Sequence, residues 1–266
     1  MKNTQIISVI NQKGGVGKTT TVINLATALS FYKKKVLVID LDPQGNATTG
    51  LGLSNNEDGK TVYDVLNGKC SLRESIRNTD IENLKLISSN VDLSGLEVET
   101  ASESRRAFLL KDKVEDFINS STNDFSYIFI DCPPSLSLLT VMSLVVAKSL
   151  IVPLQAEFFA LEGLSQLMKT IDRVKMKLNP ELEIRGVLLT MFDRRNKLSS
   201  QVDGDAREFF KDKVYQTVIP RNVRLSEAPS HGMPILIYDK TCSGSISYSN
   251  FAAEFLKQEN IMESAA

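Results

Sequence analysis

Residues 11–20 read Asn11-Gln12-Lys13-Gly14-Gly15-Val16-Gly17-Lys18-Thr19-Thr20 and lie between an apolar run at 6–10 and a helical pattern that begins at Thr20. Because the glycines carry no side chain, successive backbone N–H groups can curl around a polyphosphate. The N-terminus of the following helix adds the positive end of its dipole. Strand, glycine loop and helix come in the order that a phosphate-binding loop requires, whereas the simpler alternative is a glycine turn with two solvated lysines.

Side chains of this loop have the chemistry to bind ATP together with a metal. Lys18 supplies a positive charge for the β- and γ-phosphates, and the Thr19 hydroxyl is placed to ligate the Mg²⁺ that bridges them. The predicted nucleotide-binding residues of the loop are Lys13, Gly14, Gly15, Val16, Gly17, Lys18, Thr19 and Thr20.

The loop departs from the general P-loop pattern in one place. That pattern has a glycine where this chain has Gln12, and the loop opens instead with a second lysine, Lys13. Lys-Gly-Gly-Val-Gly-Lys-Thr-Thr resembles the deviant Walker A P-loop of the ParA and MinD ATPases. The resemblance implies that Lys13 acts in catalysis by reaching across a dimer interface to the ATP of a partner subunit, so that two copies enclose the nucleotides.

A pair of carboxylates follows the apolar run at 36–39. Asp40 and Asp42 are two residues apart, so their side chains point the same way where a strand of an α/β fold meets its ligand. In isolation an Asp-x-Asp-Pro turn is common, but here it accompanies a phosphate loop. The stretch resembles the switch segment of the ParA-like family, which implies that Asp42 orients the attacking water and that Asp40 supports the metal.

A third carboxylate ends the apolar strand predicted at 127–130. Asp131 precedes Cys132 and two prolines, which stop the strand. A carboxylate in this place holds Mg²⁺ through water in P-loop enzymes, although a strand that ends in Asp is often only a turn. The predicted metal site therefore consists of Thr19, Asp40 and Asp131, and Cys132 is expected to be a packed thiol.

The rest of the chain alternates strands and helices, which predicts an α/β fold: a doubly wound, mostly parallel sheet with helices on both faces. Further strands are expected at 84–88, 149–154 and 184–191, and helices at 61–66, 72–76, 104–119, 161–177 and 199–210. The Gly, Asn and Asp content of residues 44–60 predicts a mobile loop. No linker or repeat divides the chain, so we expect a single domain over residues 1–266.

The composition limits the possible partners. With 31 basic and 32 acidic residues, the net charge gives no argument for a nucleic-acid or membrane partner, so such a surface must be local. Residues 1–5 run into the first strand without a signal segment, and no apolar run reaches membrane-spanning length. Three widely spaced cysteines indicate neither a disulfide framework nor a zinc site. We expect a cytoplasmic protein.

Two arginine pairs mark a candidate DNA surface. Arg194 and Arg195 follow the strand at 184–191, and Arg221 and Arg224 lie within residues 219–229, which closely resemble the chromosomal ParA (Soj-like) branch. The resemblance implies that arginines in these segments bind DNA without sequence specificity. Four arginines in two short loops can track phosphates, because backbone contacts need charge but no base readout. The alternative is a scattered, solvated surface.

The same resemblance carries one further implication and one departure. It implies that Pro220 and Asn222 lie at the adenine. After Tyr238-Asp239 the branch usually carries two arginines, whereas this chain has Lys240-Thr241-Cys242-Ser243-Gly244-Ser245. The missing arginines imply a DNA affinity below that of the branch.

The resemblance spans residues 5–257 and implies a Mg²⁺-dependent ATP hydrolase that switches between a monomer and an ATP-bound homodimer. The dimer would bind nucleoid double-stranded DNA, and a ParB-like partner would stimulate hydrolysis in chromosome or plasmid segregation. One alternative is a MinD-like membrane-cycling ATPase, but residues 257–266 contain one lysine and no arginine, which does not fit a basic membrane-binding helix. The other is a nucleotide-gated scaffold with little hydrolysis, against which Asp42 and Asp131 argue weakly.

Overall fold

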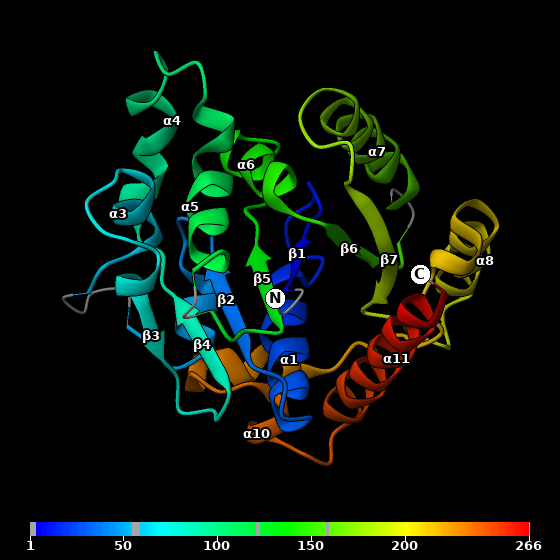
Figure 1. Ribbon diagram of the computed structural model, residues 1–266. Coiled ribbons are helices and arrows are strands. Elements are labelled where there is room, and N and C mark those ends of the chain that lie inside the picture. The colour runs from blue at the N-terminus through cyan, green and yellow to red at the C-terminus, as the bar shows by residue number, and fades with distance from the viewer. Residues whose placement is uncertain (1–3, 55–58, 121–122, 158–159, 266) are drawn as a thin grey trace.

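A twisted seven-stranded sheet with the strand order β3-β4-β2-β5-β1-β6-β7 forms the centre of the molecule (Figure 1). The computed structural model describes residues 4–54, 59–120, 123–157 and 160–265. Only the β3–β4 pairing is antiparallel among the described strands. The strands are β1 (Gln5–Val9), β2 (Val36–Asp40), β3 (Ile76–Asn78), β4 (Leu84–Ile87), β5 (Tyr127–Asp131), β6 (Ser149–Gln155) and β7 (Glu183–Thr190).

Helices cover both faces of this sheet. They are α1 (Lys18–Phe31), α2 (Asn46–Gly50), α3 (Val62–Leu66), α4 (Leu96–Glu99), α5 (Leu109–Ile118), α6 (Leu138–Val146), α7 (Ala160–Lys177), α8 (Lys197–Phe210), α9 (Val223–Glu227), α10 (Ile235–Tyr238) and α11 (Ser243–Ala265). Short 3₁₀ turns occupy Arg73–Ser75, Val91–Gly95, Arg106–Phe108, Lys211–Lys213 and Ala228–His231.

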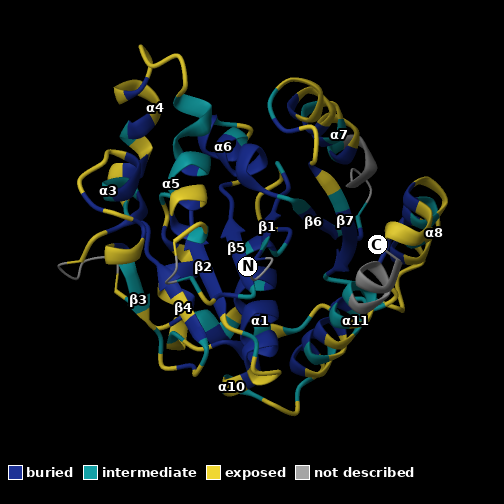
Figure 2. Cartoon of the chain, in the orientation of Figure 1, coloured by how far each residue is buried: buried dark blue, intermediate teal, exposed yellow. Residues whose placement is uncertain are grey.

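Alternate side chains of each central strand enter different apolar clusters. On β2, Val36 and Val38 pack with α1 and α11, whereas Leu37 and Ile39 pack with α3, α5 and α6. This alternation follows from the two-residue period of a strand, and it buries both faces of the sheet (Figure 2). A third cluster joins β6 and β7 to α7 and α8. The predicted doubly wound, mostly parallel α/β fold is therefore confirmed.

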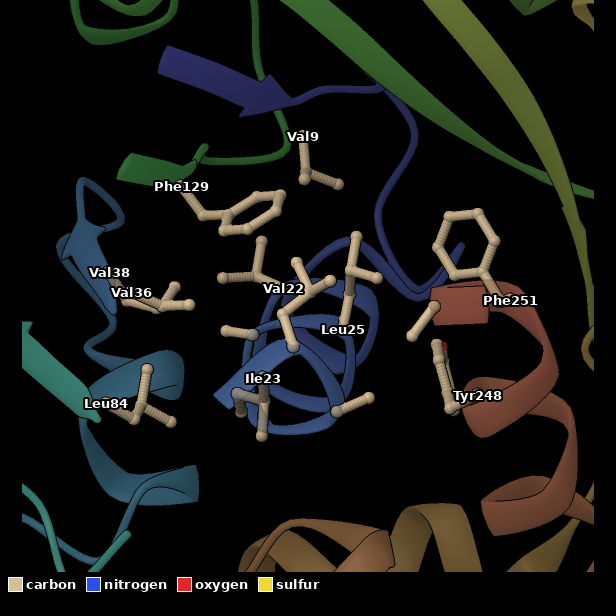
Figure 3. Close-up of a cluster of buried hydrophobic side chains, with 14 of the residues drawn as sticks. Val9, Val22, Ile23, Leu25, Val36, Val38, Leu84, Phe129, Tyr248 and Phe251 are labelled. Atoms are coloured by element: carbon tan, nitrogen blue, oxygen red, sulfur yellow. The ribbon is translucent and has the colours of Figure 1, made fainter. Parts of the chain in front are cut away.

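Helix α1 has apolar neighbours on several sides. Figure 3 shows Val22 and Leu25 between Phe129 of β5 and Phe251 of α11, and all four side chains are fully buried. Burial around α1 fixes the direction in which its N-terminus points. Since that N-terminus follows the glycine loop directly, packing of α1 also fixes the loop.

Several predicted elements differ from the structure. The loop predicted at 44–60 is wrong over α2, and residues 55–58 lie outside the described residues. The helix predicted at 72–76 is a 3₁₀ turn at Arg73–Ser75 followed by the edge strand β3. The helix predicted at 104–119 consists of a 3₁₀ turn and α5. These elements are short, and neighbouring segments rather than local sequence determine their form.

The end of α2 contacts a distant turn, backbone against backbone. Gly52 and Gly232 both have left-handed conformations, with φ of 80° and 63°. A Cβ on Gly232 would lie 2.9 Å from the Cα of Gly52, and a Cβ on Gly52 would lie 3.0 Å from the carbonyl oxygen of Gly232. Glycine at both positions therefore lets the segment after Asp42 pack directly on the turn after Ala228–His231.

Strand register brings the predicted acidic residues together. Asp131 at the end of β5 pairs with Val9 of β1 on one side and with Asp40 of β2 on the other. Strand β1 lies between β5 and β6, where the direction of chain winding reverses. Ligands of open α/β sheets bind at this point, beyond the carboxyl ends of the strands.

Candidate active site

The glycine loop after β1 borders a cavity at the N-terminus of α1. Gly15 and Gly17 have φ of 75° and 87°, which favour glycine, and Gly17 caps α1 without a side-chain hydrogen bond. The first N–H groups of α1 therefore remain available to an anion. The cavity has a volume of about 350 Å³ and is lined by Gly14, Gly15, Gly17, Lys18, Thr19, Thr20, Ile23, Asp42, Asn46, Thr49, Pro134, Met191 and Pro229.

Residues from distant strands hold the loop from behind. The Asn11 side-chain amide donates to the carbonyl oxygen of Pro153 (2.8 Å), and its Oδ1 accepts from the backbone N–H of Lys13 (3.0 Å). The Thr190 hydroxyl donates to the carbonyl oxygen of Val16 (2.8 Å). These contacts keep the loop in shape without a ligand. Neither Asn11 nor Thr190 is among the predicted site residues, because Pro153 and Val16, to which they donate, are more than 100 residues away in the sequence.

Lys18 is buried at the centre of the site. Its Nζ donates to the carbonyl oxygen of Lys13 at 3.0 Å, so the side chain folds back over the loop. Burial lowers the pKa of Lys18, while the nearby carboxylates of Asp131 and Asp42 oppose this shift. The ammonium group thus lies between the loop carbonyls and two acids, where a phosphate oxygen would compete for it.

Lys13 does not line the cavity of its own chain. It is exposed, and its Nζ forms an ion pair with the carboxylate of Glu157. The neighbouring Gln12 amide donates to the carbonyl oxygen of Gly163 at 2.7 Å. Val16 is also outside the lining, because its side chain is buried. Within one chain, therefore, Val16 can contact a nucleotide through its backbone but not through its side chain. The side chain of Lys13 is directed away from the cavity.

Asp131 is the residue that best fits a metal ion. It is completely buried, and neither of its carboxylate oxygens has a hydrogen bond of ordinary geometry among the described residues. Burial raises the pKa of Asp131 well above its usual range and Asp40 raises it further, while the Thr19 hydroxyl lowers it. A buried carboxylate beside a threonine hydroxyl offers the oxygen ligands that Mg²⁺ prefers. The residues present therefore fit this ion.

Asp40 is engaged with the protein. One oxygen accepts from the backbone N–H and hydroxyl of Thr48 (2.8 and 2.7 Å), and the other accepts from the N–H of Asp42 (3.2 Å). Burial raises the pKa of Asp40 to about 6, although these hydrogen bonds oppose the shift. The geometry favours a role in which Asp40 anchors α2 rather than touching the metal. Thr48 is not among the predicted site residues, because the composition of its segment predicts a loop.

Asp42 faces the cavity that Lys18 also lines. One carboxylate oxygen accepts from the N–H of Gln44 at 3.0 Å, and the other accepts no hydrogen bond from the described residues. The side chain is 5% exposed, so it reaches the cavity but little bulk water. A carboxylate held through one oxygen can direct the second at a bound water molecule.

Asp131→Asn should raise the melting temperature of the ligand-free protein by about 2–4 °C at pH 8, the size of a stabilisation of about 1 kcal/mol in a chain of this length. The pKa of Asp131 is higher in the folded than in the unfolded state, so folding takes up a proton at pH values between the two pKa values. The free energy of unfolding therefore falls as the pH rises from the unfolded pKa toward the folded pKa. Asparagine removes this loss. Thermal unfolding of the parent and the variant between pH 5 and 8 tests this prediction. A variant with a lower melting temperature and an unchanged pH dependence would contradict it.

Pro220 and Asn222 line a second cavity of about 270 Å³. It shares Gly17, Thr20, Met191 and Pro229 with the lining of the first cavity, so the two cavities are neighbours along the loop. The amide of Asn222 is engaged in structure: Oδ1 accepts from the N–H of Arg224 and caps α9, and Nδ2 donates to the Ser243 hydroxyl, each at 2.8 Å. Both predicted adenine residues thus lie near the loop.

Three of the four predicted DNA-binding arginines border one hollow. Arg194, Arg195 and Arg221 line it together with Ser243, and its volume is about 480 Å³. Arg194 and Arg221 have no ion pair with described residues, whereas Arg195 is paired with Asp193 (3.0 Å). The structure does not bring Arg224 to this hollow.

Arg224 instead pairs with two acids. Its guanidinium lies 2.8 Å from Glu227 and 3.7 Å from Asp239. The segment after Asp239, which lacks the two arginines usual in the ParA branch, reaches the hollow of the other three arginines, because Ser243 lines it together with Arg221.

In the part of the chain that the structure describes, no helix is both long and apolar enough to cross a membrane.

A family model and two known proteins match most of this chain. The sequence model of a family described as AAA domain matches residues 4–184. The chain is 50% identical to the chromosome partitioning protein ParA of Caulobacter vibrioides, over 98% of this chain and 97% of that protein. It is 48% identical to the sporulation initiation inhibitor protein Soj of Bacillus subtilis, over 94% of this chain and 97% of that protein.

A solved structure extends the comparison to the fold. Cobyrinic acid a,c-diamide synthase from Mycobacterium smegmatis, with a bound ATP analog and magnesium, superposes with a TM-score of 0.84 and is 35% identical. The match covers 96% of this chain and 94% of that one.

Proposed function

Because the chain belongs to the ParA/Soj family of chromosome-partitioning ATPases, we propose that it binds ATP with Mg²⁺ and hydrolyses ATP to ADP and phosphate beside Gly17. One observation carries this proposal: Lys18 and Asp42 meet at the N-terminus of α1, beside the buried Asp131, whose oxygens accept no hydrogen bond of ordinary geometry from described residues. The ATP analog and magnesium of the M. smegmatis relative support the choice of ligands.

Each site residue has one task in the proposed reaction. Water attacks the γ-phosphorus, the bond to the β,γ-bridging oxygen breaks, and ADP leaves with the electron pair of that bond. Lys18 and the N–H groups of α1 stabilise negative charge on the phosphate oxygens. Asp42 orients the water through its second oxygen. Thr19 and Asp131 would hold Mg²⁺, which when bound neutralises phosphate charge, and Asp40 holds the segment that carries Asp42.

Phosphate release tests the reaction directly. We expect ATP turnover with Mg²⁺ and none with EDTA, and we expect DNA to co-sediment with the protein in ATP but not in ADP. Turnover that persists in EDTA would contradict the metal requirement. ATP binding without turnover, alone and with a ParB-like partner, would favour the nucleotide-gated scaffold, and ATP-dependent binding to liposomes would favour the MinD-like alternative.

The exposed position of Lys13 supports a role between two subunits. In one chain its Nζ is paired with Glu157 rather than directed at the cavity, so it is available to a second copy once that pair opens. The proposed active species is an ATP-bound homodimer in which each Lys13 contacts the nucleotide of the partner. A surface ion pair is weak enough to exchange for a phosphate contact.

Lys13→Ala should therefore keep ATP affinity within about threefold but block ATP-driven dimerisation, because the lost contact is made only in the dimer. Light scattering with ATP measures the mass, and Lys85→Ala, which removes an exposed lysine from β4, is the control. Dimerisation of the Lys13 variant at the parental concentration would refute a role between subunits.

Non-specific DNA binding is proposed for the hollow that Arg194, Arg195 and Arg221 line. The chain is nearly neutral, so attraction to phosphate must come from a local patch, and two of these arginines are free of ion pairs with described residues. Dimerisation would double the patch and make binding depend on ATP. A ParB-like protein is the proposed partner that stimulates hydrolysis during chromosome or plasmid segregation.

Arg194→Ala and Arg221→Ala should each flatten the slope of log affinity against log salt on duplex DNA by about 0.9 for each subunit that contacts the DNA, because each phosphate contact releases condensed counterions. Arg224→Ala is the matched control and should change the slope less, since Arg224 is already paired with Glu227 and Asp239. Ser243→Arg should steepen the slope. Fluorescence anisotropy from 50 to 200 mM salt measures the slope for each variant. Equal slopes for all variants would place the DNA surface elsewhere.

A further inference from the structure

A hollow between α7 and α8 has an apolar floor and an aromatic wall. Its volume is about 470 Å³, and its lining is Leu164, Ser165, Asp205, Glu208, Phe209 and Phe210. Leu164 and Phe210 are buried in the cluster that joins these helices to β6 and β7. Phe209, in contrast, is 66% exposed and stands edge-on to Phe210, with ring centres 4.7 Å apart. Aromatic side chains are enriched among the residues that anchor protein interfaces, and hot-spot residues of interfaces lie in packed pockets.

The charged groups of this hollow have one sign. Asp205 and Glu208 form no ion pair with described residues. The nearest base on the helix, Arg207, is engaged elsewhere: it donates to Asp203 at 2.7 Å and to the carbonyl oxygen of Tyr215 at 3.1 Å. Two uncompensated carboxylates therefore lie beside an exposed aromatic ring.

Gly204 gives a second, independent observation. It is an exposed glycine within α8, where glycine weakens a helix relative to alanine. A Cβ at this position would meet no atom within 4 Å, so no internal contact requires the glycine. Gly204 precedes Glu208 by one helical turn, and the two are neighbours on the helix surface. The missing side chain leaves room for the backbone of a partner.

We propose that Phe209, Asp205, Glu208 and Gly204 form a docking surface for a protein segment that carries arginine or lysine next to a large apolar side chain. The apolar side chain fills the hollow over Leu164 and Phe210. The basic group pairs with the two carboxylates while its stem covers the ring of Phe209. Charge complementarity selects this occupant, and the lining of the hollow shares no residue with the lining of the cavity at the glycine loop.

A phage-displayed library of random 12-residue peptides, selected on the nucleotide-free protein, tests the proposal. Counter-selection uses the double variant Asp205→Asn/Glu208→Gln. We expect enriched sequences to combine arginine or lysine with a large apolar residue. No enrichment, or enriched sequences without basic residues, would overturn the proposal.

Affinities of an enriched peptide, measured by fluorescence anisotropy, then locate the site. Phe209→Ser and the double variant should each weaken binding by about tenfold or more. Gly204→Gln should weaken binding while the melting temperature stays level or rises, which separates binding from folding. Asp80→Asn/Glu82→Gln removes the same charge from exposed residues beside β3 and β4 and should have no effect. Equal affinity of the peptide for the parent and for all variants would overturn the proposed site. Loss of self-association in the Phe209 variant would also overturn the proposal, because the surface would then bind a second copy of this chain and not another protein.

Discussion

Lys18→Ala should weaken ATP binding by about 100-fold. The Lys18 ammonium is buried at the head of α1, and among the described residues it has one hydrogen-bond acceptor, the carbonyl oxygen of Lys13. A charge-assisted contact to phosphate in such a site contributes up to about 3 kcal/mol, which corresponds to about two decades of affinity. No other basic side chain lines this cavity, among the residues that the structure describes, to take over the contact.

Calorimetric titration with ATP and Mg²⁺ measures this loss, with Lys85→Ala as the control. The variant should stay folded, because Lys18 forms its hydrogen bond within the loop and not in the apolar core. Its melting temperature without ligand should thus be close to that of the parent. Parental ATP affinity in Lys18→Ala would show that the cavity at the loop is not the nucleotide site.

Asp42→Ala should slow ATP hydrolysis by about 100-fold or more while ATP affinity changes by less than about threefold. The reason is that Asp42 is held through one oxygen and offers the other to the cavity, a geometry for directing water. Positioned general-base and water-orienting groups contribute at least about 100-fold to rate. The phosphate contacts of the loop remain intact in this variant, so binding should survive.

Single-turnover phosphate release measures the rate for Asp42→Ala, and light scattering follows the dimer. ATP dimers should accumulate in the variant, because hydrolysis no longer returns them to monomers. Glu82→Ala, an exposed acid beside β4, serves as the control. Hydrolysis at the parental rate would assign the water to another residue, whereas loss of both binding and hydrolysis would make Asp42 a binding residue.

The parts of the fold that were predicted correctly are those whose information is local. The loop at 11–20 joins β1 to α1 as predicted, because glycine spacing, the apolar strand and the helical period all lie within about 30 consecutive residues. Asp40 and Asp131 were predicted to end strands, and parallel pairing places them in register.

The features that escaped prediction depend on partners far away in the sequence. Helix α2 was taken for a loop because its composition favours turns, and Thr48 joins it to Asp40 only once β2 has formed. Glu157 pairs with Lys13 across 144 residues, a contact that no local pattern contains. The antiparallel edge strand β3 has only three residues, too few to show a period.

The contact between Gly52 and Gly232 bears on how the site can change during evolution. Asn46 and Thr49 of α2 form one wall of the cavity, and Pro229, three residues before Gly232, forms part of another. Because the two backbones touch at the glycines, they set how closely these walls approach. A side chain at either position would widen the cavity from a distance. Selection for a ligand of a different size could therefore act on two residues that do not line the cavity.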